Sequence, residues 1–207
     1  MKTFLTLIFS LMMTQLAWGQ EAPVVGRDAA AKYFQKRDPA QSYNSGNSNS
    51  DHFLAIHFGR YMGSQSYDWS KQGQKDDVGG NNFGVTYRMG EWQNSMDLHI
   101  RIDYTEFDLP EENASKLSFM PLITFPDASS RFPLYFGAGL GLGVFFKQVS
   151  DKSALSLDYQ LVLGARFFDI FENTGFFIEA GLKNHIHVLS SGQFNGTFLA
   201  GGLVFTF

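Results

Sequence analysis

Four of the five histidines and nine of the charged residues fall on the polar side of an alternating pattern, and these side chains could carry chemistry. The histidines, His57, His99, His185 and His187, could bind a metal ion or transfer protons. The sequence has no cysteine, however, and these histidines do not follow the spacing of a metal-binding motif. Only His185 and His187 are close, about 7 Å apart if they lie on one strand. We therefore expect hydrogen-bonded histidines, with no metal site, no catalytic site and no cofactor.

The nine charged residues are interleaved with apolar residues at alternate positions. Five are basic and four are acidic: Arg88, Arg101, Lys116, Arg166 and Lys183 against Asp97, Asp103, Asp158 and Glu179. Burial of a single unpaired charge carries a large desolvation cost. If a fold encloses these residues, we expect them to pair with one another.

The elements that must position these residues are strands. After Asp51 the apolar residues recur at every second position, and eight segments are each about as long as a tilted membrane strand, which needs roughly 9 to 11 residues. We expect strands at about residues 51–61, 81–89, 96–105, 116–125, 134–144, 155–167, 176–187 and 195–207. In each segment one face is apolar and the other carries polar residues or glycine.

The length of the apolar faces favours a membrane barrel over a soluble sandwich. They continue for about ten residues, whereas strands of soluble proteins usually have about five or six. We predict an all-β fold, an eight-stranded antiparallel transmembrane up-and-down β-barrel over residues 51–207. Its narrow lumen would be filled by side chains, without an open pore. The predicted lumen network consists of Arg88, Asp97, His99, Arg101, Asp103, Lys116, Asp158, Arg166, Glu179, Lys183, His185 and His187.

Four glycines, Gly137, Gly139, Gly141 and Gly143, keep a period of two within one predicted strand. This spacing differs from the GxGxxG of a dinucleotide-binding loop. The glycines either make room for bulky side chains of neighbouring strands or leave a groove for an acyl chain or another ligand.

The N-terminal residues 1–19 have the features of a secretory signal peptide. Lys2 supplies a positive charge, an apolar run follows, and the small residues Ala17 and Gly19 precede the expected cleavage site. An apolar run of about ten residues is too short to cross a membrane as a helix. Residues 20–50 are expected to form a periplasmic tail with a short helix and a flexible linker.

The first external loop, at about residues 62–80, is expected to be long and polar. Its residues Tyr67, Asp68, Trp69 and Lys71 are the best candidates for contact with an extracellular partner. A nucleic-acid partner is not expected, because the net charge of −4 becomes −5 without Lys2 and the sequence has no basic run.

These features resemble the small outer-membrane β-barrel proteins of Gram-negative bacteria, the OmpA transmembrane-domain and OmpX-like group. The ending GGLVFTF resembles the C-terminal signal read by the barrel-assembly machinery, with Gly202, Phe205 and Phe207 at the matching positions. The resemblance implies an outer-membrane location. It also implies that outer-membrane lipid, lipopolysaccharide and the assembly machinery are partners, in addition to an extracellular or periplasmic protein.

Outer-membrane barrels also include lipid A deacylases, which use a histidine and a serine two residues apart on a late strand and a glutamate further on. Here Leu189 stands two residues after His187, Ser190 stands three after it, and no acidic residue follows Glu179. We therefore predict a non-enzymatic role in structure, adhesion or partner binding. A lipid-modifying enzyme that uses His187 and Ser190, or a narrow small-solute channel, is the alternative.

Overall fold

The structure is a computed structural model that describes residues 52–68, 73–93, 95–108, 113–147 and 153–207. Within these ranges the chain forms one short 3-10 helix, η1 (Ala128–Ser130), and nine strands. The strands are β1 (Phe53–Asp68), β2 (Gly73–Asp76), β3 (Gly79–Gln93), β4 (Met96–Phe107), β5 (Ala114–Phe125), β6 (Leu134–Lys147), β7 (Leu155–Phe171), β8 (Thr174–His187) and β9 (Gln193–Thr206). The predicted signal peptide and periplasmic tail lie outside the described residues. No helix in the described ranges is long and apolar enough to cross a membrane.

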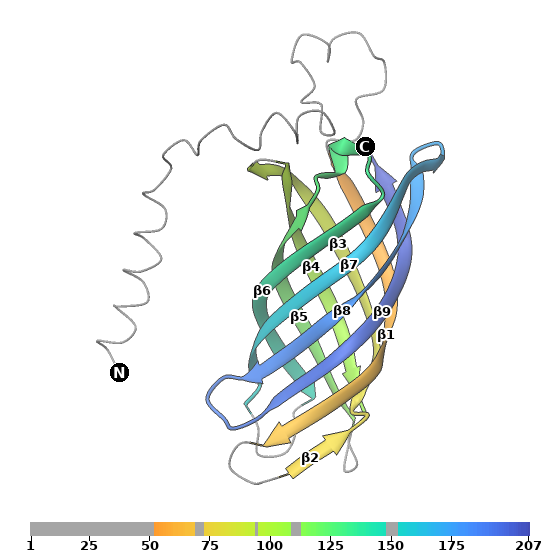
Figure 1. Cartoon of the computed structure of the whole chain (residues 1–207). Coiled ribbons are helices and arrows are strands. Elements are labelled where there is room, and N and C mark those ends of the chain that lie inside the picture. The colour runs from red at the N-terminus through yellow and green to blue at the C-terminus, as the bar shows by residue number, and fades with distance from the viewer. Residues whose placement is uncertain (1–51, 69–72, 94, 109–112, 148–152) are drawn as a thin grey trace, which may run out of the picture. The chain divides into compact units, whose positions relative to one another are not determined.

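The strands form a closed antiparallel barrel (Figure 1). The strands from β3 to β9 pair in chain order, β3 also pairs with β1, and β1 closes the sheet by pairing with β9. The short β2 and the longer β3 occupy the same side of β1, where β2 pairs with residues 65–68 and β3 with residues 54–60. They therefore share one position in the wall, and the barrel has eight strands around its circumference. The predicted fold class is confirmed.

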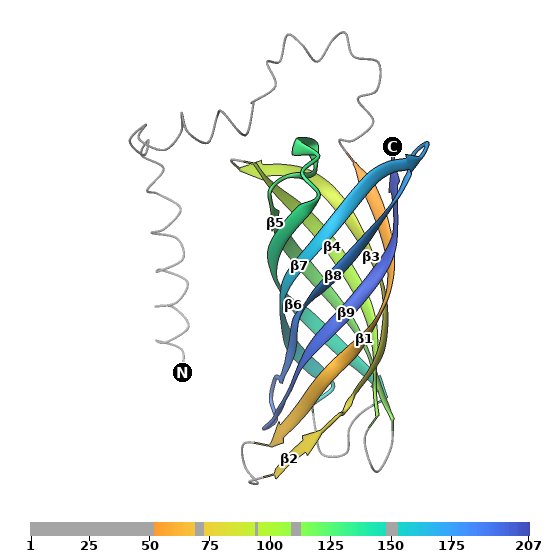
Figure 2. The same cartoon turned by 45° about the vertical axis from the view of Figure 1, so that its right-hand side comes forward.

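The two ends of the barrel differ in their connections. The end that contains Phe207, here called the C-terminal end, also contains η1 and the tight turns that precede Met96 and Thr174. The opposite end, here called the far end, contains β2, the last residues of β1 and the first residues of β9 (Figures 1 and 2). Because the number of strands around the wall is even, the first and last strands of the barrel begin and end at the same side.

The alternation of residues along each strand separates the lumen from the outer surface. Outward-facing Phe58, Phe136 and Leu163 are 60%, 57% and 65% exposed, whereas inward-facing His57 and Tyr135 are 1% and 4% exposed. Successive side chains of a strand point to opposite faces, so a strict period of two gives this result without further adjustment. The polar face is the inner face of this barrel.

Around the far end the first predicted loop is much shorter than expected. We predicted that the first strand ends at Tyr61 and that residues 62–80 form a loop, but β1 continues to Asp68 and β2 occupies Gly73–Asp76. The added part of β1 pairs with the start of β9, as Tyr67 lies opposite Gln193. Tyr67 and Asp68 are thus strand residues, and the other two predicted contacts, Trp69 and Lys71, lie outside the described residues. The prediction was wrong because this segment is polar on both faces and lacks the alternation that marks the other strands.

At the far end, on the side formed by β1, β3 and β4, the outer face of the wall becomes polar and the inner face becomes apolar. Outward-facing Arg60, Asn81 and Glu106 are polar and exposed. Inward, an apolar cluster consists of Val78, Phe107, Ala114, Phe145 and Phe194. A polar outer face and an apolar inner face are typical of a β-barrel in water, so this part of the wall extends beyond the apolar zone.

Candidate functional site in the barrel lumen

The lumen contains four groups of paired charges. Nearest the C-terminal end, Arg88 Nη2 donates to Asp97 Oδ1 at 2.6 Å, and both side chains are buried. The other oxygen of Asp97, Oδ2, accepts a hydrogen bond from the backbone N–H of Ala128 at 2.7 Å. Asp97 therefore ties η1 to the barrel wall across this end of the lumen.

The second group lies further into the lumen and is centred on Glu179. Arg101 donates to both carboxylate oxygens of Glu179, at 2.6 and 3.0 Å, and its Nε donates to Thr86 Oγ1 at 2.9 Å. The hydroxyl of Tyr135 donates to Glu179 Oε2 at 2.8 Å. Two-pronged contacts of this kind are the strongest arrangement for a guanidinium and a carboxylate. This group links β3, β4, β6 and β8.

The third group contains Asp103, which lies between two inward-facing bases. Lys183 Nζ lies 2.5 Å from Asp103 Oδ2, and His57 Nε2 lies 3.0 Å from Asp103 Oδ1. The wall around His57 is tight, because a Cβ atom at Gly202 would lie 2.8 Å from His57 Cα. The glycine that we assigned to the C-terminal assembly signal thus also allows β9 to approach β1 closely.

The fourth group, near the far end, is centred on Asp158. Its Oδ1 lies 2.7 Å from Lys116 Nζ, 2.7 Å from Ser156 Oγ and 3.0 Å from His185 Nδ1. His185 Nε2 lies 2.7 Å from the hydroxyl of Tyr61. Lys116 Nζ also contacts His185 Nδ1, so this ring nitrogen faces both an ammonium donor and a carboxylate acceptor.

One of the glycines in the predicted β6 series borders this fourth group. A Cβ atom at Gly143 would lie 2.6 Å from Asp158 Oδ2 and 3.0 Å from Lys116 Nζ. The space left by Gly143 is filled by these charged side chains. Of the two readings of the glycine series, room for neighbouring side chains is the one that this position supports.

Apolar clusters lie at both ends of the charged interior. At the far end the rings of Phe107 and Phe194 stack with centroids 4.8 Å apart, and Phe145 stacks on His187 at 5.2 Å. At the C-terminal end a second cluster is formed by Phe53, Ala55, Ala128, Phe177 and Val204. Three of the charged groups therefore lie between two apolar clusters, and the Arg88–Asp97 group lies beside the cluster at the C-terminal end.

The two remaining histidines of the predicted network also make polar contacts. His99 Nε2 lies 2.9 Å from Thr124 Oγ1, and His187 Nδ1 lies 3.3 Å from the backbone oxygen of Ser153. Ser190 Oγ accepts a hydrogen bond from the backbone N–H of Ser153 at 2.8 Å. His187 and Ser190 thus engage opposite backbone groups of Ser153. Among the described residues, no group of three or more histidines and carboxylates could hold a metal ion.

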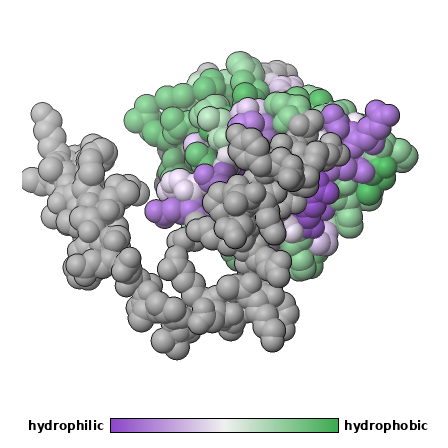
Figure 3. Space-filling model, turned by 90° about the horizontal axis from the view of Figure 1, so that it is seen from above, coloured by the Kyte–Doolittle hydropathy of each residue, from purple (hydrophilic) through white to green (hydrophobic). Residues whose placement is uncertain are grey.

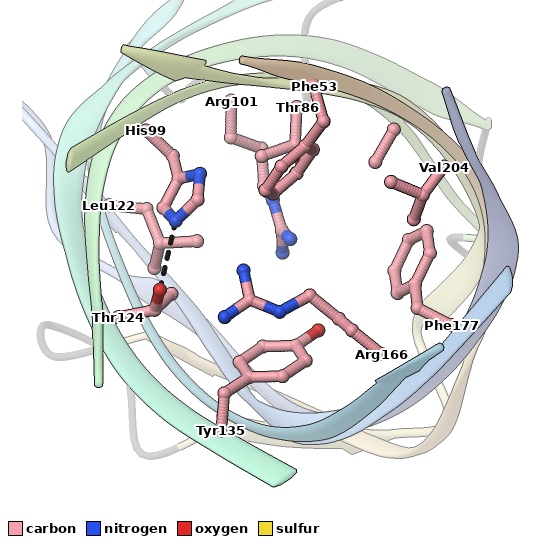
Figure 4. A pocket seen from close by; sticks show the side chains of 11 residues that line it. Phe53, Thr86, His99, Arg101, Leu122, Thr124, Tyr135, Arg166, Phe177 and Val204 are labelled. Carbon is pink, nitrogen blue, oxygen red and sulfur yellow. Dashed lines mark hydrogen bonds between the residues drawn. The ribbon is translucent and has the colours of Figure 1, made fainter. Parts of the chain in front are cut away.

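The fifth basic residue of the network, Arg166, borders a cavity near the C-terminal end (Figure 4). The cavity has a volume of about 20 Å³. In the part of the chain that the structure describes, no carboxylate forms an ion pair with Arg166. Its lining is mixed, with five aliphatic or aromatic residues and six polar ones: Phe53, Ala55, Leu122, Phe177 and Val204, with Thr86, His99, Arg101, Thr124, Tyr135 and Arg166.

The outer surface of the barrel is a broad apolar belt. Leu140, Leu142 and Leu161 on its wall are 56%, 64% and 51% exposed, a degree of exposure that is unusual for large apolar side chains of a protein in water. Seen from the C-terminal end, hydrophobic residues occupy much of the circumference, and hydrophilic residues gather in patches (Figure 3). A closed barrel satisfies its backbone hydrogen bonds internally, so it can present such a belt to lipid.

No family model matches the sequence, and no curated protein matches it. Among solved structures, the chain is similar to the outer-membrane enzyme PagL, with 16% identity and a TM-score of 0.46 over 70% of this chain and 97% of that one. It is also similar to Ail, the attachment invasion locus protein of Yersinia pestis, with 20% identity and a TM-score of 0.47 over 75% and 99%. A third structure is the N-terminal β-barrel domain of Pseudomonas aeruginosa OprF, with 14% identity and a TM-score of 0.38 over 74% and 98%.

The closed wall, the apolar belt and the charged lumen together decide the class of this protein. It is a small outer-membrane β-barrel. Its architecture is that of the OmpA transmembrane-domain and OmpX-like group. In such barrels the short turns face the periplasm and the longer loops face outward, so we expect the C-terminal end of this barrel to be periplasmic and its far end to be external.

Several residues that complete the lumen of the outer-membrane barrel were absent from the predicted network. Tyr61, Tyr135 and Ser156 each hydrogen-bond a member of an ion-paired group. Phe107 and Phe145 seal the far end. The alternation along the strands could have predicted them. Each lies an even number of positions from a charged residue or glycine on the predicted lumen face of the same strand.

Proposed function

We propose that this outer-membrane barrel is a non-enzymatic envelope protein, which anchors in lipid by its belt and presents its far end to an external partner. The observation that carries the proposal is the filled interior, in which three ion-paired groups lie between two apolar clusters and a fourth lies beside the cluster at the C-terminal end. In an eight-stranded barrel the interior is only wide enough for side chains to fill it. An interior used in this way supports a stabilising role rather than transport.

The contacts of His187 argue against the lipid-modifying alternative. His187 is 4% exposed, and its ring packs against Phe145 and Phe194 inside the barrel. A general base for lipid hydrolysis must reach its substrate and the nucleophile within hydrogen-bond distance. The side chain is instead directed into the apolar seal, away from the lipid.

The far end supports the choice of partner surface. There β1 and β2 form a hairpin, and β1 also pairs with the first residues of β9. The polar outer face that begins near Arg60 and Glu106 gives this region a water-exposed surface on a rigid support. We place the contacts with an extracellular protein on this hairpin, including Tyr67 and Asp68. Outer-membrane lipid and lipopolysaccharide contact the belt, and the assembly machinery reads the segment that ends in Phe207.

Planar-bilayer recording tests the closed lumen. The wild-type protein is expected to give no discrete conductance steps. A control variant that replaces Arg101, Glu179, Lys116 and Asp158 by serine removes two ion-paired groups, and we expect it to conduct if it inserts. Regular steps from the wild-type barrel would overturn the proposal in favour of a channel.

Two further measurements separate the proposed role from the enzyme. Incubation with lipid A followed by mass spectrometry should show unchanged acyl chains, and acyl loss that disappears with His187→Ala would refute the proposal.

Cells that display the protein should adhere to immobilised extracellular-matrix proteins better than cells that display a variant with residues 69–72 replaced by glycine and serine. Equal adhesion by both would remove the hairpin as the contact surface.

A further inference from the structure

Among the described residues, the predicted lumen network contains five cations and four carboxylates, and the structure shows which of these cations has no ion pair. Arg88, Arg101, Lys116 and Lys183 each pair with one acidic residue. Arg166 is only 6% exposed, yet the described residues provide it with no carboxylate partner. An unneutralised charge in such a site is costly unless something compensates it.

The contacts that Arg166 does make leave most of its donors unused. Its guanidinium stacks on the ring of Tyr135, with the central carbon 4.2 Å from the ring centroid. Its Nη2 donates one bond, 3.3 Å long, to the backbone oxygen of Pro126, and its buried Nε has no hydrogen-bond partner. Stacking satisfies the face of a guanidinium, but its five N–H donors lie in the plane of the group. Those donors are available to an acceptor beside the ring.

The cavity beside Arg166 lies where such an acceptor would fit. In Figure 4 the guanidinium groups of Arg166 and Arg101 both point toward the middle of the cavity. Arg101 is neutralised by Glu179, so the cavity keeps the full positive charge of Arg166. Thr86 Oγ1 accepts a bond from Arg101 Nε, which leaves the hydroxyl proton of Thr86 free to donate. No carboxylate is among the lining residues.

We propose that this cavity binds a small monovalent anion, of the size of chloride, between Arg166 and Arg101. The charge of the ion offsets the unpaired guanidinium, and the in-plane N–H groups of Arg166 and the hydroxyl of Thr86 donate to it. A volume of about 20 Å³ holds a water molecule or an ion of similar size. We expect larger anions such as sulfate and gluconate to bind less well.

The position of the cavity sets the side from which the ion enters. Its lining includes Phe53, Ala55, Phe177 and Val204, which belong to the apolar cluster of the C-terminal end. The ion therefore exchanges with the periplasm, past η1. The far-end groups around Lys116 and Asp158 take no part in this exchange.

Crystals of the wild-type protein grown in sodium bromide provide the direct test. An anomalous difference peak is expected in the cavity between Arg166 and Arg101, and it should be absent from Arg166→Gln crystals. Density for water alone in the wild-type cavity, or bromide only at the protein surface, would overturn the proposal. The bromide result and the bilayer recordings can fail separately. An empty cavity in a protein that does not conduct would refute only the anion site, whereas an occupied cavity in a protein that conducts would refute only the closed lumen.

A solution measurement covers the case in which Arg166→Gln does not fold. The urea midpoint of unfolding of the wild-type barrel is followed as chloride replaces gluconate at constant ionic strength. A saturable rise is expected with chloride, because a ligand that binds only the folded state stabilises it, and none is expected when sulfate replaces gluconate. Arg131→Gln is the matched control and should keep the rise, because Arg131 is exposed and pairs with Asp169. No saturable rise in the wild type, or the same rise with sulfate, would refute the site.

Discussion

The lumen holds a buried cation near each of its ends, Lys116 near the external end and Arg166 near the periplasmic end, and their surroundings differ. Lys116 contacts the carboxylate of Asp158, the hydroxyl of Ser156 and the imidazole of His185. The Arg166 side chain contacts one backbone oxygen and the rings of Tyr135, Phe53 and Phe168, and it borders a cavity. The first arrangement is complete within the chain, whereas the second leaves space and charge for a ligand.

This difference shows that burial alone does not define the role of a lumen charge. A buried ion pair fixes the positions of the strands that carry it, and loss of one partner is strongly destabilising. A buried cation without a carboxylate adds little to stability by itself, but it gives a cavity its selectivity. Four predictions, in order of decreasing effect, test whether the two ends differ in this way.

The largest effect is expected for Asp158→Asn at the external end. The substitution keeps the shape of the side chain but leaves Lys116 without its carboxylate, which should lower the free energy of unfolding by about 3–5 kcal/mol. Urea titration of the protein refolded into lipid vesicles measures the change. The double variant with Lys116→Met should recover much of the loss, and failure to recover any would show that the pair is not the reason.

A slightly smaller effect is expected for Phe107→Ala in the external apolar seal. Phe107 is 1% exposed and packs against Phe194 and Phe145, so truncation leaves a cavity and should lower stability by about 3 kcal/mol. The matched control is Phe146→Ala, because Phe146 is 66% exposed on the outer surface. The same urea titration should show a clearly smaller loss for that variant, and equal losses would contradict the assignment of Phe107 to a packed seal.

Arg166→Met should change stability by less than about 1 kcal/mol when gluconate is the only anion. The loss of stacking on Tyr135 is offset by removal of an unneutralised buried charge. Lys116→Met under the same conditions should be far more destabilising, because it leaves Asp158 without a cation. If the two methionine variants lose the same stability, the comparison between the ends is wrong.

The smallest effect is expected for Asp127→Asn in the periplasmic turn. Burial raises the pKa of the Asp127 carboxyl, and the nearby carboxylates Asp97 and Glu91 raise it further. A raised pKa in the folded state means that the protonated form contributes stability below the ordinary pKa of aspartate, and that this contribution is lost as pH rises through the raised value.

Asparagine at position 127 keeps an acceptor for the backbone N–H of Ser130, which donates to Asp127 Oδ1 at 2.7 Å. The variant should therefore differ from the wild type by a few tenths of a kcal/mol, roughly, and lack this part of the pH dependence. Urea midpoints measured across the acidic range test it. An unchanged pH profile would show that Asp127 titrates normally.

The sequence was sufficient to predict the barrel because lipid makes the outer face apolar at every second residue. In β4 the alternation of Ile100 and Ile102 with Arg101 and Asp103 assigns each side chain to its face before any contact is known. The polar end of β1 escaped prediction for the same reason. There both faces meet water or polar neighbours, and a strand in water does not need a continuous apolar face.

The pairing inside the lumen was beyond sequence reasoning. Arg101 and Glu179 are far apart in the chain and meet only because the shear of the barrel brings β4 and β8 across from each other. The sequence places five basic and four acidic residues on the predicted lumen face, and from this we predicted only that they pair with one another. These counts do not show that Arg166 is the cation without an ion pair, because its partners depend on the register of strands that are not neighbours in the sequence.

The seam between β1 and β9 has a consequence for how the protein reaches its final form. Phe53 pairs with Thr206 and Tyr67 with Gln193, so one edge of β1 cannot pair until β9 has been synthesised and positioned. Until the C-terminal residues arrive, β1 has an unpaired edge of backbone donors and acceptors, which is prone to join other chains. Contacts that span so much of the chain also form slowly. We therefore expect that the chain needs protection from aggregation until β9 is in place. Even a nearly complete chain that lacks β9 would keep the edge of β1 unpaired.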